Sequence, residues 1–124
     1  MNTFSSINRT LQLYFDMLYF CDLEKFDAVF HHQAIYVCAD ESTTLFRNMV
    51  DYRHILSNRK SPATSNEKRK DIIDSIELAG ENTARARVRC SIGTRDFVDF
   101  LTLIREKNEW CIIAKVFQII ENEE

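Results

Sequence analysis

The stretch that most constrains the fold is residues 95–120, which has the pattern of two long strands joined by a tight turn. The two limbs, residues 97–104 and 110–120, are rich in β-branched and aromatic side chains, and residues 105–109 between them are mostly charged. Apolar residues fall on both faces of each limb, so we expect helices to cover one face and a partner surface to cover the other. Because a two-stranded ribbon alone is only marginally stable in water, this hairpin requires further strands and a helical layer.

The rest of the chain supplies those elements. Apolar residues recur at helical spacing in three segments, and Asp22 is positioned to cap the second of them. These patterns predict helices at residues 3–19, 23–30 and 45–57. Short runs of β-branched residues, one of them strictly alternating, predict further strands at residues 34–38, 71–78 and 83–91. The predicted order is therefore two helices, a strand, a helix and four meandering strands.

Two positively charged features each have two interpretations. The strand predicted at residues 83–91 carries Arg85, Arg87 and Arg89 on one side, where we expect a solvated or dimer-facing surface, with anion binding as the alternative. Residues 58–70 form the one long polar connection. We expect a mobile, solvated loop there, and an anion-attracting lid is the alternative.

Length and composition limit the class of protein. We expect a single domain over residues 1–124, with its core at about residues 7–120. A formal net charge of −3 and a pI near 5.6 argue against nucleic acid as a partner. The polar first ten residues predict no signal peptide, and no run approaches the length of a membrane span. The four cysteines are widely spaced without a CxxC pair, so we expect free thiols in the cytoplasm, no metal site and no cofactor.

The segment FHHQAIYV and the ending DFVDFLTLIREKNEWCIIAKVFQ resemble the nuclear transport factor 2-like superfamily. Within it the chain is most similar to the bacterial proteins described as putative lumazine-binding, which are relatives of the SnoaL-like polyketide cyclases and the ketosteroid isomerases. The matching residues in the ending are Asp99, Phe100, Leu101, Leu103, Trp110, Ile112, Lys115, Val116 and Phe117. The resemblance implies a cone-shaped α+β roll of the cystatin-like kind. Three N-terminal helices would pack on the concave face of a strongly curved, mainly antiparallel sheet, with a mostly apolar pocket at the open end.

The resemblance does not extend to isomerase chemistry. Those enzymes use a carboxylate base together with a tyrosine and a protonated aspartic acid as hydrogen-bond donors. Tyr14 falls at the position of the tyrosine donor, whereas the base position falls at Cys38 and the acid position at Leu101. Two of the three catalytic positions therefore lack the carboxyl group that the reaction requires.

The candidate pocket residues are Tyr14, Tyr36, Cys38, Asp99 and Lys115. Tyr36 and Cys38 share one face of a short strand, and Tyr14 lies beside the apolar stripe of the first helix. Asp99, on an otherwise apolar strand, is the candidate catalytic residue, because a buried carboxylate must find a partner or shift its pKa.

Lys115 is the natural partner of Asp99, and the register of the hairpin decides whether they meet. A turn of two or four residues places Asp99 opposite Val116. A turn of three residues places Asp99 opposite Phe117, with Lys115 as its diagonal neighbour on one face. A structural ion pair and an acid–base pair in a pocket are both compatible with that second arrangement.

Two functions follow from these features. The first is a domain that binds a small apolar or aromatic molecule, including an enzyme of the cyclase, isomerase or dehydratase kind acting on a small ring compound. The alternative is a noncatalytic dimeric interaction domain whose cone is filled by its own side chains. A cavity of roughly 300 Å³ or more would favour the first. For both functions we expect a homodimer formed through the sheet, because the terminal hairpin is apolar on both faces.

Overall fold

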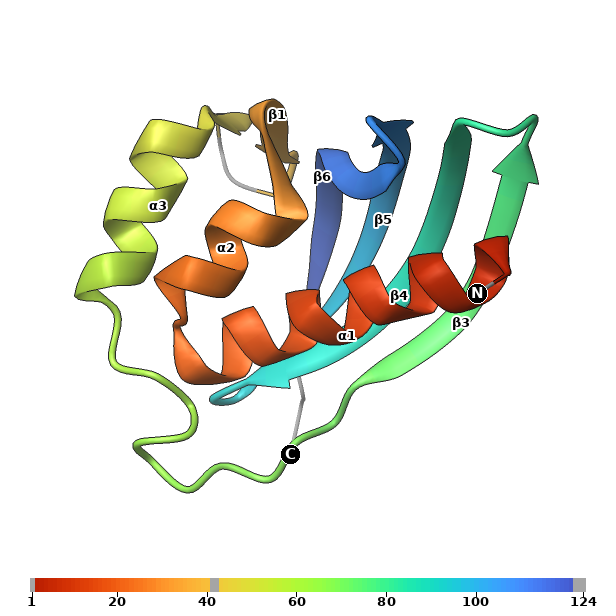
Figure 1. Cartoon of the computed structure of the whole chain (residues 1–124). Coiled ribbons are helices and arrows are strands. Elements are labelled where there is room, and N and C mark those ends of the chain that lie inside the picture. The colour runs from red at the N-terminus through yellow and green to blue at the C-terminus, as the bar shows by residue number, and fades with distance from the viewer. Residues whose placement is uncertain (1, 41–42, 122–124) are drawn as a thin grey trace.

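The computed structural model describes residues 2–40 and 43–121, and within them the chain forms three helices and one six-stranded sheet (Figure 1). The elements in chain order are α1 (Thr3–Phe20), α2 (Leu23–Val29), β1 (Phe30–Cys38), β2 (Leu45–Arg47), α3 (Met49–Asn58), β3 (Ile72–Ala79), β4 (Thr83–Ile92), β5 (Arg95–Glu106) and β6 (Glu109–Glu121).

Side-chain caps explain where the helices begin. The side chain of Asn2 accepts a hydrogen bond from the backbone N–H of Ser5 at the start of α1, and α1 ends at Cys21, whose φ of 50° is left-handed. Asp22 caps α2 as predicted, accepting from the N–H of Lys25. The buried stripe of α1 consists of Ile7, Thr10, Leu11, Tyr14, Phe15, Met17 and Leu18.

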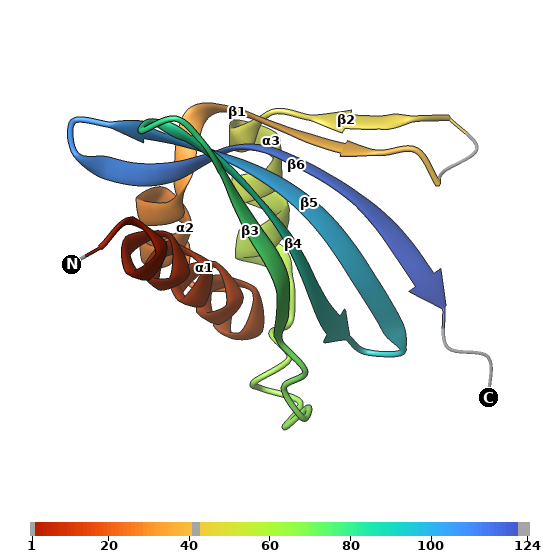
Figure 2. The same cartoon turned by 90° about the vertical axis from the view of Figure 1, so that its right-hand side faces the viewer.

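The sheet is bent strongly around the helices. Its strand order is β2-β1-β6-β5-β4-β3, and every neighbouring pair is antiparallel except β1 and β6, which run parallel. Figure 2 shows the long strands curving over α1, with all three helices on the concave side. The predicted fold class, an α+β roll with helices on the concave face of a mainly antiparallel sheet, is confirmed.

The boundaries around the third helix differ from the prediction. Residues 45–47 form the short edge strand β2 instead of the first turn of a helix, and they pair with the end of β1. The helix begins only at Met49 because Asn48 acts as its N-cap, accepting a hydrogen bond of 2.8 Å from the N–H of Asp51. β1 is also longer than predicted, since it starts at Phe30.

The terminal hairpin combines a two-residue turn with a bulge. Lys107 and Asn108 occupy the turn with φ of 52° and 64°, the positive values that a type I′ turn requires. The register shifts between Thr102 and Leu103: Thr102 pairs with Ala114, whereas Leu103 pairs with Ile112. One extra residue on β6 is absorbed there. As a result Asp99 lies opposite Phe117 and not opposite Val116.

The two positively charged features of the sequence are both held by hydrogen bonds. Arg87 and Arg89 donate to Asp74 on β3, and Arg85 donates to Glu77. The arginine row on the outer face is therefore paired with carboxylates of the neighbouring strand. The connection between α3 and β3 is fastened through Glu67, whose carbonyl accepts from the Tyr19 hydroxyl and whose carboxylate accepts from the N–H of Gly93, both at 2.6 Å.

Candidate functional site

A buried carboxylate lies at the centre of the cone. Asp99 on β5 has no exposed surface, and its Oδ2 accepts a hydrogen bond of 2.6 Å from the hydroxyl of Tyr14 on α1. Its other oxygen, Oδ1, is buried and has no hydrogen-bond partner among the described residues. Leaving a buried polar atom unpaired costs about 1–3 kcal/mol, more when the group is charged. Within the described residues, therefore, only one of the two carboxylate oxygens of Asp99 is hydrogen-bonded.

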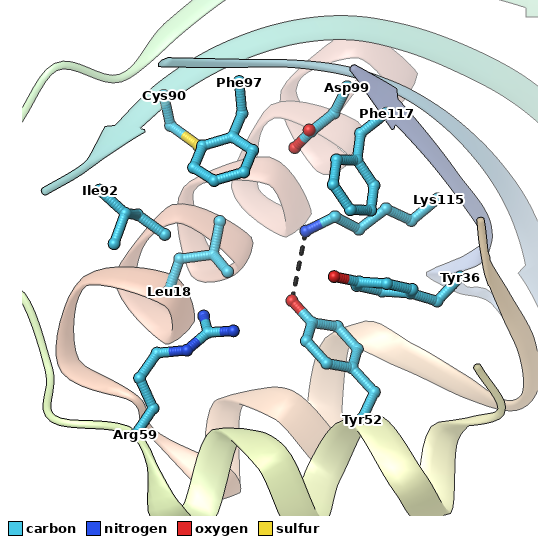
Figure 3. Close-up of a pocket in the computed structure, with 10 residues that line it drawn as sticks. All are labelled: Leu18, Tyr36, Tyr52, Arg59, Cys90, Ile92, Phe97, Asp99, Lys115 and Phe117. Atoms are coloured by element: carbon cyan, nitrogen blue, oxygen red, sulfur yellow. Dashed lines mark hydrogen bonds between the residues drawn. The ribbon is translucent and has the colours of Figure 1, made fainter. Parts of the chain in front are cut away.

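A buried ammonium accompanies this carboxylate. Lys115 on β6 is 6% exposed, and its Nζ donates a hydrogen bond of 3.2 Å to the hydroxyl of Tyr52 on α3 (Figure 3). Four aromatic rings surround Nζ, with centroids 5.1–5.5 Å away: Tyr14, Tyr36, Tyr52 and Phe117. Rings at this distance stabilise a desolvated cation through their electron-rich faces. No direct ion pair within 4.0 Å joins Lys115 and Asp99 in the part of the chain that the structure describes.

The surroundings shift the pKa of several groups in this cluster. Burial and the Asp99 carboxylate raise the pKa of Tyr14 well above its ordinary value, so Tyr14 remains a hydrogen-bond donor. Burial lowers the pKa of Lys115, but Tyr52 and Asp99 raise it by more, so the ammonium persists at neutral pH. Burial, with Asp99 as the second cause, raises the pKa of the Cys90 thiol to about 12.

A small cavity of about 30 Å³ lies beside these groups and is partly open to solvent. It is lined by Leu18, Tyr36, Tyr52, Arg59, Cys90, Ile92, Phe97, Asp99, Lys115 and Phe117 (Figure 3). This volume accommodates one or two water molecules, whereas pockets for drug-sized ligands occupy about 300–1,000 Å³. This cavity is therefore too small for a drug-sized ligand unless side chains around it move.

Arg59 forms one wall of the cavity. It follows the last residue of α3, and its guanidinium points toward the space between Leu18 and Tyr52 (Figure 3). The Arg59 side chain makes no hydrogen bond or ion pair with any residue in the ranges 2–40 and 43–121. Its position is therefore held by packing alone.

The chain is similar to known proteins in both sequence and three-dimensional structure. The family model described as putative lumazine-binding matches residues 2–118. The chain belongs to this family. No curated protein matches the chain.

Solved structures related to this family member share its fold at low sequence identity. An NTF2-like protein of unknown function from Silicibacter pomeroyi superimposes with a TM-score of 0.85 at 20% identity, covering 97% of this chain and all of the other. An NTF2-like protein from Shewanella baltica gives a TM-score of 0.84 at 20% identity, covering 96% and 94% of the two chains. A ketosteroid isomerase-like protein from Erwinia carotovora atroseptica gives 0.73 at 8% identity, covering 95% and 96%. The family member therefore has the nuclear transport factor 2-like fold.

The structure brings together most of the pocket residues predicted from the sequence. Tyr36, Asp99 and Lys115 line the cavity, and Tyr14 lies behind Asp99 as its hydrogen-bond partner. Cys38 is fully buried and does not line the cavity. Lys115 is the diagonal neighbour of Asp99, although the turn has two residues, because the bulge provides the extra step.

Sequence reasoning missed two polar residues of the site. Tyr52 belongs to the buried stripe of α3 with Met49 and Leu56, and helical spacing alone does not distinguish such a residue from one that lines a site. Arg59 lies within a polar run, and nothing in that run distinguishes it from its neighbour Lys60.

The polar groups around the cavity are suited to hydrogen bonding. No group of three or more His, Cys, Asp or Glu side chains in the described residues is placed to hold a metal ion. The polar groups facing the cavity are one carboxylate, two cationic groups and two phenols. In the described residues no helix is both long and apolar enough to cross a membrane.

Proposed function

We propose that this domain binds a small ring compound at the open end of the cone, with a polar edge of the compound hydrogen-bonded to Asp99. The observation that carries this proposal is Oδ1 of Asp99, which is buried beside the cavity and has no hydrogen-bond partner in the described part of the chain. Buried polar atoms in folded proteins are almost always paired, so an unpaired one requires an explanation. A water molecule in the cavity would pair Oδ1, and a ligand that donates an N–H or O–H to Oδ1 would take the place of that water.

Entry of a ring requires the cavity to enlarge, and Arg59 is the residue best placed to move. Its side chain lies on the connection after α3 and has no hydrogen bond to break in the described structure. Phe97 and Ile92, which also line the cavity, are only partly buried. Rotation of these three side chains would widen the mouth without disturbing the helices or the sheet.

The test is a screen of small ring compounds by thermal shift on the wild type and on Asp99→Asn. The substitution keeps an oxygen to accept from Tyr14 but replaces the free acceptor with an N–H₂ donor. A compound at 100 times its Kd stabilises the wild type by about 2.7 kcal/mol. We expect this stabilisation to be lost in Asp99→Asn.

The matched control is Asp96→Asn. Asp96 is on the same strand, carries the same charge and lies outside the cavity lining, where its carboxylate accepts from Ser91. If both variants respond to the compounds as the wild type does, Asp99 has no part in binding. A screen without any stabilising compound would count against the function itself.

In a catalytic version of this site, Asp99 is the group to transfer a proton. A cyclase, isomerase or dehydratase acting on a ring compound moves a proton at carbon or oxygen, and this requires an acid or base within hydrogen-bond reach. Asp99 would take that role, and Lys115 would stabilise negative charge that develops on the substrate. Turnover would then be lost in Asp99→Asn even where binding survives.

A second candidate function is a noncatalytic dimeric interaction domain, and two observations favour it. The cavity is small, and the outer face of the sheet carries an apolar row that crosses four strands. In this row Phe46 pairs with Val37, Val37 with Val116, and Val116 with Phe100. We propose that a second copy of the chain covers this row, which is compatible with ligand binding in the cone.

The four free cysteines suit a reducing compartment, and we propose the cytoplasm.

A further inference from the structure

We propose that the cavity selects monoanionic ring compounds, with the negative group bound between Lys115 and Arg59. This inference rests on the proposed function, because it specifies the chemical class of the ligand that the cone would bind.

The charge balance of the cavity lining is the first argument. Two cationic side chains, Arg59 and Lys115, and one carboxylate, Asp99, line it, so the lining has a net charge of +1. Asp99 already accepts a hydrogen bond from Tyr14, which stabilises its negative charge. Charges in a poorly solvated site are costly unless they are balanced. A ligand with a single negative charge makes the liganded cavity neutral.

The unused hydrogen-bonding capacity of the two cationic groups is the second argument. The ammonium of Lys115 has three N–H donors, and its one hydrogen bond in the described structure goes to Tyr52. The guanidinium of Arg59 has five donors, none of them used within the same residues. The hydroxyl of Tyr36 also points toward the cavity (Figure 3). These donors converge from the residue after α3, from β1 and from β6 on one small space, where an anionic oxygen would accept hydrogen bonds from several of them at once.

The persistence of the Lys115 charge supports the same conclusion. A buried lysine without compensation would become neutral near physiological pH. Here Tyr52 and Asp99 outweigh the effect of burial and raise the pKa of Lys115, so the ammonium is available to an anion. Arg59 remains charged at any working pH.

The experiment compares ring carboxylates with their neutral carboxamides. The pairs are 4-hydroxybenzoate and 4-hydroxybenzamide, indole-5-carboxylate and indole-5-carboxamide, and indole-3-acetate and indole-3-acetamide. Every one of these compounds has a ring O–H or N–H that can donate to Asp99, as the proposed function requires. Each pair has nearly the same shape and differs in charge. A charge-assisted hydrogen bond contributes about 1.5–3 kcal/mol, so we expect the better-bound carboxylate to have at least a roughly tenfold lower Kd than its carboxamide by calorimetry.

Arg59→Gln and Lys60→Gln distinguish a direct contact between Arg59 and the ligand from an effect of the overall charge of the protein. Both remove one positive charge at adjacent positions, but only Arg59 lines the cavity. Because the Arg59 side chain makes no hydrogen bond to the described residues, Arg59→Gln leaves the fold intact. We expect it to weaken carboxylate binding about tenfold and to leave carboxamide binding within about twofold. Lys60→Gln is expected to change neither.

The outcomes distinguish this inference from the function on which it rests. Equal binding of carboxylates and carboxamides, or an equal effect of both substitutions, overturns the monoanion preference and leaves ring binding in place. Binding of no compound of either kind at millimolar concentration overturns both.

Discussion

Asp99 and Lys115 are diagonal neighbours on the inner face of the sheet, and a bulge in β6 makes them so. The turn of the hairpin has two residues, which by itself would place Asp99 opposite Val116. The extra residue absorbed between the Thr102 and Leu103 pairs moves Asp99 opposite Phe117 instead. Both charged side chains therefore face the helices, where Tyr14 and Tyr52 provide their hydrogen bonds.

The hydrogen bond from Tyr14 is expected to stabilise the fold more than an ordinary tyrosine contact. Tyr14→Phe would leave both oxygens of Asp99 without a partner, and hydrogen bonds to charged groups contribute about 1.5–3 kcal/mol. Urea unfolding should show a loss of that size. Tyr19→Phe is the matched control, since it removes a hydrogen bond of the same 2.6 Å length to the partly buried carbonyl of Glu67. A smaller loss for Tyr14→Phe than for Tyr19→Phe would contradict the central role of Asp99.

Stability is expected to fall as the pH rises above about 9. The Cys90 thiol has an ordinary pKa of 9.0 and a folded-state pKa of about 12, so the folded state binds more protons than the unfolded state between these values. The stabilisation is complete below pH 9.0 and is lost progressively up to about pH 12. The raised pKa of Lys115 and Tyr14 acts in the same direction.

The alkaline effect can be measured by urea unfolding at a series of pH values. Each fully responding group contributes a slope of about 1.4 kcal/mol per pH unit. Cys90→Ala removes one of the groups, so its stability should decline less steeply than that of the wild type. Cys111→Ala provides a comparison at a less buried thiol. Parallel curves for Cys90→Ala and the wild type would show that the Cys90 thiol does not contribute.

The apolar row on the outer face predicts a dimer. Phe46, Phe100 and Val116 are 73%, 57% and 42% exposed, and together with Val37 they form one row across the sheet. Light scattering at tens of micromolar should give about twice the chain mass of 14.6 kDa. Phe100→Glu should give the monomer mass, because it places a charge within the apolar row.

Phe4→Glu is the control for this substitution. Phe4 is similarly exposed, at 53%, but lies on α1, away from the outer face. Phe4→Glu should therefore leave the dimer intact. A wild-type mass near that of one chain would exclude the dimer at that concentration.

The start of α3 can be tested through its cap. Asn48→Ala removes the hydrogen bond to the N–H of Asp51, and loss of an N-cap costs about 1 kcal/mol. Unfolding of the variant should show this loss. If the helix began at residue 45, as its apolar periodicity suggests, Asn48 would be an interior position and alanine there would stabilise the protein.

The sequence predicted the fold well because its strongest patterns are local. The apolar stripe of α1, the Asp22 cap and the alternation of β4 each express a packing requirement that adjacent residues reveal. The start of α3 was predicted incorrectly because residues 45–47 fit a helix, and only their pairing with β1 draws them into the sheet. Tertiary pairing outweighed local periodicity there.

The site was predicted less completely because it depends on register and on contacts between distant segments. Asp99 and Lys115 stood out as charges in apolar strands, but no local signal marks the bulge that unites them. The pairing of Lys115 with Tyr52 joins residues 63 positions apart. Arg59 reaches the cavity only because α3 ends beside it, and no pattern within residues 58–70 reveals that position.

Because Lys115 is buried among aromatic rings, the reactivity of its amine reports on side-chain motion inside the cone. Acylating reagents react with neutral amines that solvent can reach, and the Lys115 amine is charged and enclosed by four rings. Exposed lysines such as Lys60 and Lys68 should therefore be labelled long before it. The rate at which Lys115 is labelled then measures how often the four aromatic side chains around it move apart. A compound bound in the cavity should lower that labelling rate.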